Sequence, residues 1–306
     1  MNPLLEQPVR PGWWQRLCAG ARRLFARADW PDFAGTDWAE RIMAVEVTDD
    51  FHAKQGRSTG RWLLQAAGKQ LGVYLKRHYQ LPRWHGLLAA LWPGGDWSPA
   101  MQECRNLQWA AGHGLPVPKV VAAGEFLDPW GKLQSFLAIE ELTDMLPLHQ
   151  AIPLAARELD PLTFRIWKAG LIREIARLTR FLHQQKRFHK DLYLCHFFIA
   201  RADIKNVSCW NGRVFMIDFH RLAHHRVTWG VWESKDLGQL LYSSEVAGID
   251  VRDRLRFWHA YLGDTRRTAW GRWLRRAVVM RGGNYRKHNV KSAVKRAAEA
   301  KTKQAA

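Results

Sequence analysis

The feature that most constrains the fold of this chain is a change in its hydrophobic pattern near residue 142. Before that point, short segments rich in apolar and β-branched residues alternate with turn residues, a pattern typical of strands. The predicted strands are 42–47, 61–65, 71–76, 116–121 and 135–140, with one helix at 99–112. Beyond Leu142 apolar residues recur at helical spacing, most regularly over 163–186, and two short strands are predicted at 197–200 and 214–217. This order predicts an α+β fold of two lobes, a small strand-rich N-terminal lobe and a larger helical C-terminal lobe.

The N-terminal segment 13–25 has apolar residues at helical spacing and arginines on the other face, which predicts a basic amphipathic helix. With its paired Trp13 and Trp14, such a helix can lie in a membrane interface or pack on its own domain, and the sequence leaves both options open. We divide the chain into four parts. They are an N-terminal extension at 1–40, an N-lobe at 41–142, a C-lobe at 143–264 and a basic C-terminal tail at 265–306.

The charge of the chain is concentrated at its end. There are 47 Lys and Arg residues against 28 Asp and Glu, a net charge of +19. From Thr265 onward there are 13 basic residues and a single acid, Glu299, which is a net charge of +12. This balance predicts an anionic partner, which can be nucleic acid, anionic lipid or a phosphorylated substrate. Nucleic acid is not expected, because the chain lacks an aromatic platform motif and only charge favours it.

The cysteines and the N-terminus indicate the compartment. The four cysteines form no CxxC pair, so neither a zinc site nor a disulfide framework is expected. The first residues lack the basic start and apolar run of a signal peptide, and no apolar stretch approaches the ~18 residues that cross a bilayer. We expect a cytoplasmic protein, with peripheral attachment to a membrane left open.

The densest polar cluster is the run from His189 to His196, directly after the longest predicted helix. Asp191 lies within it, and Asp218 follows 27 residues later at the end of a short apolar strand. Two aspartates at adjacent strand ends suit phosphoryl transfer, in which one accepts the proton of the attacking hydroxyl and the other holds Mg²⁺ against the phosphates. The alternative is that both aspartates cap turns.

Three ordered segments carry a family resemblance: HKDLYLCHFFI at 189–199, IDFHR at 217–221 and KDLGQLLYSS at 235–244. Together they resemble the bacterial lipopolysaccharide core kinases of the heptose and Kdo type, which have a protein-kinase-like fold. The resemblance covers roughly residues 55–262. It implies transfer of the γ-phosphoryl group of ATP, with Mg²⁺, to a heptose or Kdo hydroxyl of the lipid A-linked inner core at the cytoplasmic face of the inner membrane. The basic surface would then hold the enzyme at this anionic membrane.

The resemblance also implies roles for residues of the N-lobe. Lys76, at the end of a strand, would contact the α- and β-phosphates and pair with Glu103 on the next helix. The loop at 55–60 would cover the phosphates through Gly56, with Ser58 and Thr59 assisting, although it lacks a full GxGxxG. Main-chain groups of the hinge at Glu140, Glu141 and Leu142 would meet the adenine.

In the C-lobe the resemblance implies that Asp191 is the catalytic base. The adjacent Lys190 is a candidate to stabilise charge on the transferring phosphoryl group, with a solvated surface lysine as the alternative. Asp218 would be the main metal ligand. His196 stands where the broader kinase fold has a metal-binding Asn, so it is a candidate ligand, with a bond to a phosphate or to the catalytic loop as the alternative. His189 is expected to organise the loop.

Asp236 would support the same loop as a buried scaffold residue that opens a helix. Only 18 residues separate Asp218 from Asp236, which leaves no room for the long activation segment of a protein kinase. Two other functions stay open: a small-molecule phosphotransferase of the aminoglycoside type, and a non-catalytic pseudokinase or lipid-binding module. The sequence does not indicate the sugar, the hydroxyl or the oligomeric state.

Overall fold

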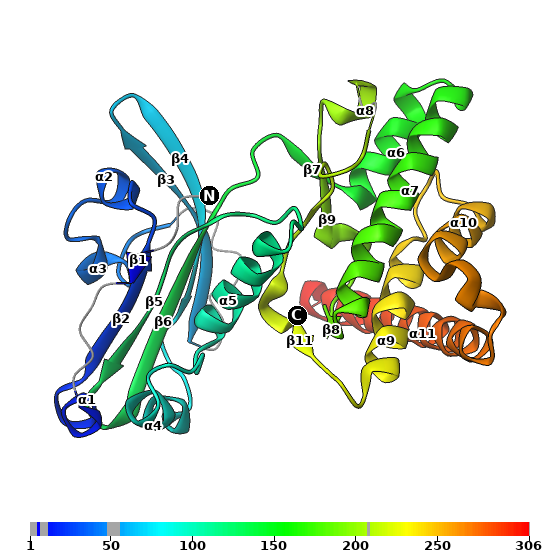
Figure 1. Cartoon of the computed structure of the whole chain (residues 1–306). Coiled ribbons are helices and arrows are strands. Elements are labelled where there is room, and N and C mark those ends of the chain that lie inside the picture. The colour runs from blue at the N-terminus through cyan, green and yellow to red at the C-terminus, as the bar shows by residue number, and fades with distance from the viewer. Residues whose placement is uncertain (1–4, 7–11, 48–55, 207–208, 306) are drawn as a thin grey trace. The chain divides into compact units, whose positions relative to one another are not determined.

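The chain divides into two compact units, Met1–Thr143 and Asp144–Ala306. The structure is a computed structural model that describes residues 5–6, 12–47, 56–206 and 209–305. The first unit is built on a sheet and the second mainly on helices (Figure 1). This arrangement confirms the α+β class predicted from the change in hydrophobic pattern.

Unit 1 contains a six-stranded antiparallel sheet with the strand order β1-β2-β5-β6-β4-β3. Its strands are β1 (Leu5–Glu6), β2 (Ala21–Ala26), β3 (Arg57–Ala66), β4 (Lys69–His78), β5 (Val120–Asp128) and β6 (Lys132–Glu140). Its helices are α1 (Trp13–Ala19), α2 (Trp30–Ala34), α3 (Trp38–Arg41), α4 (Arg83–Leu91), α5 (Pro99–Gly112) and the short η1 (Pro129–Gly131). Helices α2 and α3 cover one face of the sheet, and α5 covers the other (Figure 1).

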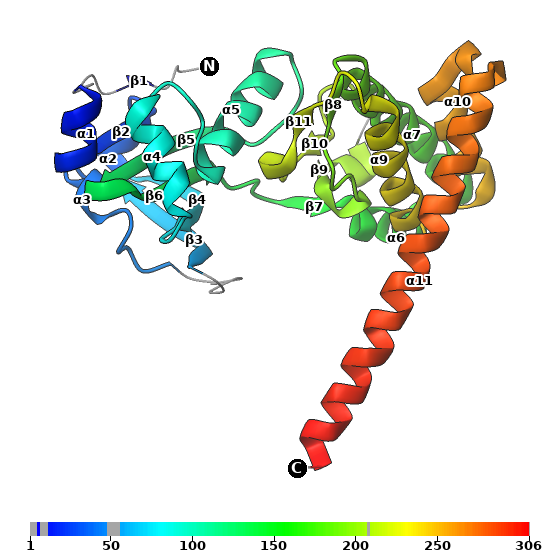
Figure 2. The ribbon, with the colours of Figure 1, turned by 90° about the horizontal axis from the view of Figure 1, so that it is seen from below.

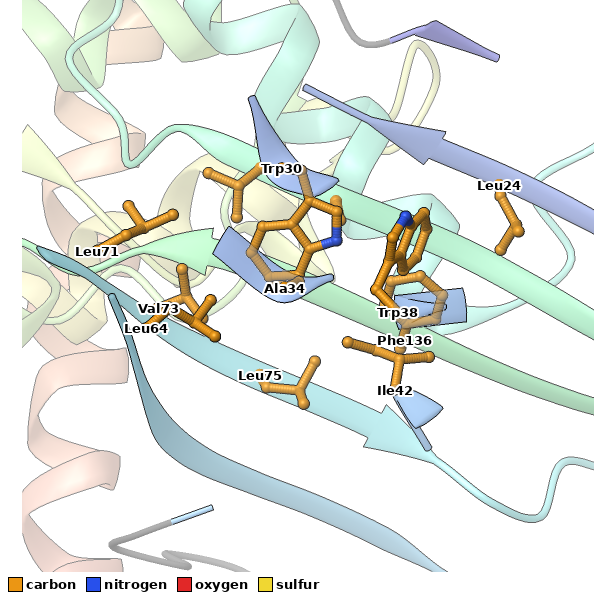
Figure 3. Close-up of a cluster of buried hydrophobic side chains, with 13 residues drawn as sticks. Leu24, Trp30, Ala34, Trp38, Ile42, Leu64, Leu71, Val73, Leu75 and Phe136 are labelled. Atoms are coloured by element: carbon orange, nitrogen blue, oxygen red, sulfur yellow. The ribbon is translucent and has the colours of Figure 1, made fainter. Parts of the chain in front are cut away.

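A buried aromatic cluster joins α2 and α3 to the sheet. The Trp30 and Trp38 rings meet edge to face, with centroids 6.2 Å apart, and Trp38 packs in the same way on Phe136 of β6. Leu75 and Val73 of β4 are fully buried beneath them (Figure 3). Side chains alternate between the faces of a strand, so the intervening residues of β4, including Lys76, lie on the opposite face.

The predicted helix at 99–112 is confirmed as α5, whereas the strand predicted at 116–121 begins only at Val120, as β5. Two further predictions for unit 1 are wrong. The predicted helix at 13–25 ends at Ala19, and Ala21–Ala26 forms β2 instead. The predicted strand at 42–47 is a turn that follows α3. Helix α1 packs on its own unit, because the buried Arg16 donates from Nε to the Ala90 carbonyl at 2.7 Å. Trp13 and Trp14 of the same helix are exposed.

Unit 2 is a helical assembly with three small strand pairings, in the sheets β10-β9-β7 and β11-β8. Its helices are α6 (Leu148–Glu158), α7 (Pro161–Gln184), α8 (Asp203–Asn206), α9 (Trp229–Ser243), α10 (Val251–Leu262) and α11 (Ala269–Ala305), with short turns η2 (Leu194–His196), η3 (Phe219–Arg221) and η4 (Gly263–Arg267). Its strands are β7 (Met145–Pro147), β8 (Arg187–Phe188), β9 (Phe197–Ala200), β10 (Phe215–Met216) and β11 (Ala223–His224). The predicted strand at 197–200 coincides with β9.

The basic C-terminal segment begins inside the fold of unit 2. Leu274 and Val278 of α11 are buried against Leu237 of α9 and Tyr261 of α10. Farther along, α11 extends beyond the other helices of the unit (Figure 2). In the part of the chain that the structure describes, none of the helices combines the length and the apolar character needed to span a bilayer.

Candidate active site

Lys76 and Glu103 form an ion pair on the face of the unit 1 sheet that α5 covers. The Lys76 ammonium lies 2.7 Å from Oε1 of Glu103, whose side chain is almost fully buried. A buried carboxylate requires such a partner, because removing it from water is costly. The pair predicted from the sequence is therefore present.

The position of α5 depends on a carboxylate that the sequence did not single out. Ser98 caps α5 by accepting a hydrogen bond from the amide of Met101 at 3.3 Å. Glu125 of β5 in turn accepts from both the Ser98 hydroxyl, at 2.6 Å, and the Ser98 amide, at 3.1 Å. Burial raises the pKa of Glu125, while the Ser98 bonds oppose that shift. This buried network fixes the start of the helix that carries Glu103.

The structure corrects the role of Ser58. In the β3–β4 ladder Ser58 pairs with Arg77 and Thr59 pairs with Lys76, and directly opposed residues share a face of the sheet. Ser58 is buried on the face away from Lys76, where its hydroxyl accepts from Arg77 Nε at 3.0 Å. Its side chain is therefore unsuited to a phosphate at Lys76. Gly56 has a positive φ of 74°, and residue 55 of the predicted loop lies outside the described residues.

The predicted hinge at the end of β6 is already engaged in part. The Glu140 amide donates to the Lys119 carbonyl at 2.8 Å, and the Glu141 amide donates to the Gly72 carbonyl at 2.8 Å. The Glu140 carboxylate lies 3.3 Å from Arg27. Among the described residues of the hinge, Leu142 is the one whose amide has no hydrogen-bond acceptor in the described part of the chain, so its N–H can meet the adenine.

In unit 2, helix α9 holds the loop that carries Asp191. The Asp236 carboxylate is fully buried and accepts from the amides of His189 and Lys190, both at 2.8 Å. One turn later Gln239 accepts from the Leu192 amide at 3.0 Å and donates to the Lys190 carbonyl at 3.1 Å. These bonds fix the conformation of the loop, including the left-handed backbone of Lys190, whose φ is 67°.

Asp236 has the expected scaffold role but not the expected place in its helix. It lies within α9, whose first residue is Trp229, so the prediction that it opens a helix is wrong. Ser243 extends the same helix face, and its hydroxyl accepts from the Leu194 amide at 2.8 Å. Asp236, Gln239 and Ser243 recur at helical spacing, a signal that was present in the sequence.

His189 links the loop to the strand that ends at Asp218. It is fully buried, and its Nε2 donates to the Ile217 carbonyl at 2.9 Å. Burial lowers the pKa of His189, which favours the neutral imidazole. An organising role, as predicted, fits this geometry better than proton transfer.

His196 lies between the two aspartates. Its Nδ1 donates to the Asp191 carbonyl at 2.7 Å, and its Nε2 lies 3.7 Å from Oδ2 of Asp218. Burial alone would lower the pKa of His196, but the interactions with Cys195, the Asp191 carbonyl and Asp218 outweigh it, and the net shift is upward. Asp218 itself has a left-handed backbone, with a φ of 66°, and is bonded to His220 at 2.5 Å. The His196 ring thus lies between the main-chain carbonyl of Asp191 and the carboxylate of Asp218.

Arg221 closes the motif at 217–221, but the sequence assigned it no role of its own. Its Nη1 bonds both carboxylate oxygens of Asp191, at 2.9 and 3.0 Å. The short turn η3 carries Arg221 back from Asp218 to this position. Unit 2 thus presents one carboxylate held by a guanidinium, and a second carboxylate joined to the same loop through His196. Two such carboxylates suit proton acceptance and the binding of a metal.

Comparisons with known proteins agree with this geometry. Residues 50–261 match the lipopolysaccharide kinase (Kdo/WaaP) family. The lipopolysaccharide core heptose(I) kinase WaaP of Pseudomonas aeruginosa is 32% identical over 162 residues, and that of Escherichia coli K12 is 31% identical over 167 residues. These matches cover 53% and 51% of this chain and 59% of each relative, so the chain spans about three fifths of the length of the curated relatives it matches.

A solved structure of WaaP in complex with acyl carrier protein is also similar. It has a TM-score of 0.63 and 25% sequence identity, and the match covers 85% of this chain and 99% of that one. This similarity confirms the two-lobe, protein-kinase-like fold that the three motifs implied.

Proposed function

This chain belongs to the lipopolysaccharide kinase (Kdo/WaaP) family, and on that premise we propose that it phosphorylates a heptose or Kdo of the lipopolysaccharide inner core, with ATP as the phosphoryl donor. The observation that carries the proposal is that the His196 ring bonds the main-chain carbonyl of Asp191 through Nδ1 and lies 3.7 Å from the Asp218 carboxylate through Nε2, so that one side chain holds the two aspartate-bearing segments together. Phosphoryl transfer requires one carboxylate at the attacking hydroxyl and another at the phosphate-bound metal.

Asp191 is assigned as the base that accepts the proton of the acceptor hydroxyl. The bonds from Asp236 and Gln239 fix the loop, so the carboxylate is oriented before the acceptor binds. The neighbouring Lys190 contributes positive charge beside it.

Lys76 is assigned to the phosphates of the nucleotide, with Glu103 positioning its ammonium. The backbone at Gly56 and the main chain of Leu142 are the remaining nucleotide contacts in this assignment. Ser58 is left out because its hydroxyl lies on the other face of the sheet, and the amide of Glu140 because it is already bonded.

The residues around Asp218 fit a Mg²⁺ site in which the nucleotide phosphates supply the remaining ligands. Magnesium is commonly held by one or two carboxylates together with waters and substrate phosphates, and the Asp218 side chain is 28% exposed. Among the described residues there is no cluster of three or more His, Cys, Asp or Glu side chains that could hold a metal. Asp218 would hold the ion, with His196 as a second, softer ligand or as the link to Asp191. Bound there, Mg²⁺ would neutralise charge on the phosphates.

A transfer assay with γ-³²P-ATP and purified core lipopolysaccharide tests the proposal. We expect Asp191→Asn to lower kcat by about 10²–10⁴-fold, the range for loss of a general base. Asp264→Asn, an exposed carboxylate of η4, is the matched control and should retain activity. Equal incorporation by Asp191→Asn and wild type would refute the assignment. The mass of core oligosaccharide from cells with and without the protein would identify the sugar.

The same assay separates the alternatives. Transfer to an aminoglycoside but not to core lipopolysaccharide would favour a small-molecule phosphotransferase. Binding of nucleotide or lipopolysaccharide without transfer to either acceptor would favour a pseudokinase. We favour the kinase because Lys76, Asp191 and Asp218 are all present, and a binding module has no chemical need for the three together.

The membrane-facing part of the proposal concerns exposed tryptophans of unit 1. They lie on or beside α1, α4 and η1, which contact one another. These residues are Trp13, Trp14, Trp84, Trp92 and Trp130. Indole rings favour the membrane–water interface, and basic residues favour anionic lipid. We propose peripheral attachment to the cytoplasmic face of the inner membrane. Sedimentation with anionic vesicles should weaken in Trp84→Ser/Trp130→Ser, and unchanged binding would contradict this surface.

Acyl carrier protein is the partner that the similar WaaP complex suggests. The supporting observation is an apolar cavity of about 100 Å³ in unit 2, between α7, α9 and α10. Leu171, Ile175, Leu240 and Phe257 contribute to its wall. We propose that it receives part of a fatty acyl chain. Leu240→Trp should abolish co-elution with acylated carrier protein, and co-elution that is the same for the acylated and unacylated forms would refute a role for the cavity.

A further inference from the structure

Two lysines, one in the catalytic loop and one in α9, share one tryptophan ring. The ammonium groups of Lys190 and Lys235 lie over Trp232, at 4.3 and 5.2 Å from the ring centroid. An indole face attracts cations, so the ring holds both side chains near the start of α9. Arg221 adds a third positive charge at Asp191. We call Lys190, Lys235 and Arg221, with Trp232 behind them, the cation cluster.

The ring that supports the cluster is itself held in place. Trp232 donates from Nε1 to the Thr228 hydroxyl at 3.1 Å, and His225 stacks on it with centroids 4.7 Å apart and planes at 21°. The amide of His225 donates to the Lys186 carbonyl at 2.9 Å. A further lysine lies over a tryptophan one helical turn before Trp232: the Lys186 ammonium is 3.9 Å from the ring centroid of Trp229.

The negative charges near the cluster are already engaged. Asp236 is fully buried, and its two oxygens accept the amides that hold the loop. Asp191 is bonded through Nη1 of Arg221, and Arg221 is 48% exposed. Burial lowers the pKa of Lys190 and of Lys235, and the charge of Arg221 lowers both further, although the charges of Asp191 and Asp236 oppose these shifts. The cations therefore repel one another, a cost that a bound anion would relieve.

We propose that the cation cluster binds an anionic group of the acceptor, a sugar carboxylate or phosphate, next to the hydroxyl that is phosphorylated. This inference rests on the proposed function and assigns the acceptor side of the site. Lys190 and Asp191 are consecutive in one braced loop, so a group bound at Lys190 lies close to the hydroxyl at Asp191. Arg221 reaches both, since it bonds Asp191 and adds N–H donors suited to an oxyanion.

Lys235 gives the sharpest test because it does not belong to the catalytic loop. We expect Lys235→Met to raise the KM for core lipopolysaccharide about 10-fold, which corresponds to about 1.4 kcal/mol. The KM for ATP should not change, and Lys235→Arg should restore most of the affinity. Lys205→Met removes the same charge from an exposed position of unit 2 and is the control. A rise in the KM for ATP alone would overturn the inference and assign the cluster to the nucleotide.

A binding experiment without ATP separates this inference from the proposed function. Isothermal titration would use the deacylated inner-core saccharide in three forms: intact, with its carboxylates reduced to alcohols, and with its phosphates removed. We expect the wild type to bind one of the two modified forms more weakly than the intact saccharide, and the group missing from that form identifies the anion. The Lys235→Met variant should bind that form and the intact saccharide equally. Equal affinity of the wild type for all three forms would refute the cluster as an anion site. Discrimination in the absence of phosphoryl transfer would retain this inference and refute the kinase.

Discussion

The clearest test of the structure concerns Asp236, which holds the catalytic loop without being placed at the reacting groups. In Asp236→Asn, one carboxylate oxygen becomes an amide nitrogen, a donor that faces the amide of His189 or Lys190. One charge-assisted bond of 2.8 Å is lost and a buried N–H is left without an acceptor. Together these effects should lower the free energy of unfolding by about 3–5 kcal/mol.

The same substitution should reduce phosphoryl transfer. A displacement of the base by about 1 Å can cost about 10²-fold in rate, so we expect kcat to fall about 100-fold with a smaller change in the KM for ATP. Urea denaturation measures the first effect, and the γ-³²P transfer assay at a temperature where the variant is folded measures the second.

Asp203→Asn is the matched control for this experiment. Asp203 is also buried and accepts a charge-assisted bond, from Arg213 at 2.6 Å, but it lies on α8, away from the loop. It should lose about 1–3 kcal/mol of stability with kcat unchanged. If Asp236→Asn is folded and keeps wild-type kcat, or if both variants lose activity in proportion to stability, the assignment of Asp236 as the support of the base is refuted.

Three further predictions follow from the site. Lys76→Met should abolish transfer and destabilise unit 1 by about 3–5 kcal/mol because Glu103 loses its partner; Lys76→Met/Glu103→Leu should recover stability, measured by urea denaturation, without activity. The pKa of His196 is raised above its ordinary value of 6.5, so its contribution to stability is present at low pH and is lost as the pH rises through the raised value. His196→Gln should remove that part of the pH dependence of unfolding, and an unchanged profile would contradict the shift. Asp218→Asn should raise the Mg²⁺ concentration for half-maximal activity by at least about 10-fold, the usual effect on metal affinity of changing a group at the site.

The local hydrophobic pattern predicted strands of the sheet, except where a contact with a distant part of the chain determines the structure. The strand at 42–47 was wrong because Arg77 of β4 donates to the carbonyls of Ile42, Met43 and Val45, at 3.5, 3.3 and 2.6 Å. A side chain far along the chain thus satisfies groups that a strand would have paired. The sequence of 42–47 contains no trace of this contact.

The helix at 13–25 was predicted too long for a different reason. Its apolar spacing continues through Gly20, but Gly20 has a φ of 80°, and a Cβ there would lie 2.4 Å from the Leu127 carbonyl oxygen. Gly20 itself indicated the end of the helix, but the apolar spacing that continues past it led to the longer prediction.

Site residues that lie within a short sequence motif could be predicted. Site residues that are far apart in the sequence and meet only in the folded chain could not. Asp191, His196 and Asp218 lie in short ordered segments, whereas Glu125 supports Glu103 only through the cap of α5. Arg221 closes the motif at 217–221, but nothing in that motif indicated its partner. Its bond to Asp191 depends on the turn η3, which the sequence pattern did not predict.

Helix α9 has a consequence for changing the specificity of this enzyme family. Its first turns carry Trp232 and Lys235, and its next turns carry Asp236 and Gln239, which hold the catalytic loop. A rotation or shift of α9 to suit a different acceptor would therefore also move the base. Transfer of acceptor preference between relatives should succeed when α9 and the segment 189–196 are exchanged as one cassette. Exchange of either piece alone should yield proteins that bind the new sugar but phosphorylate it slowly.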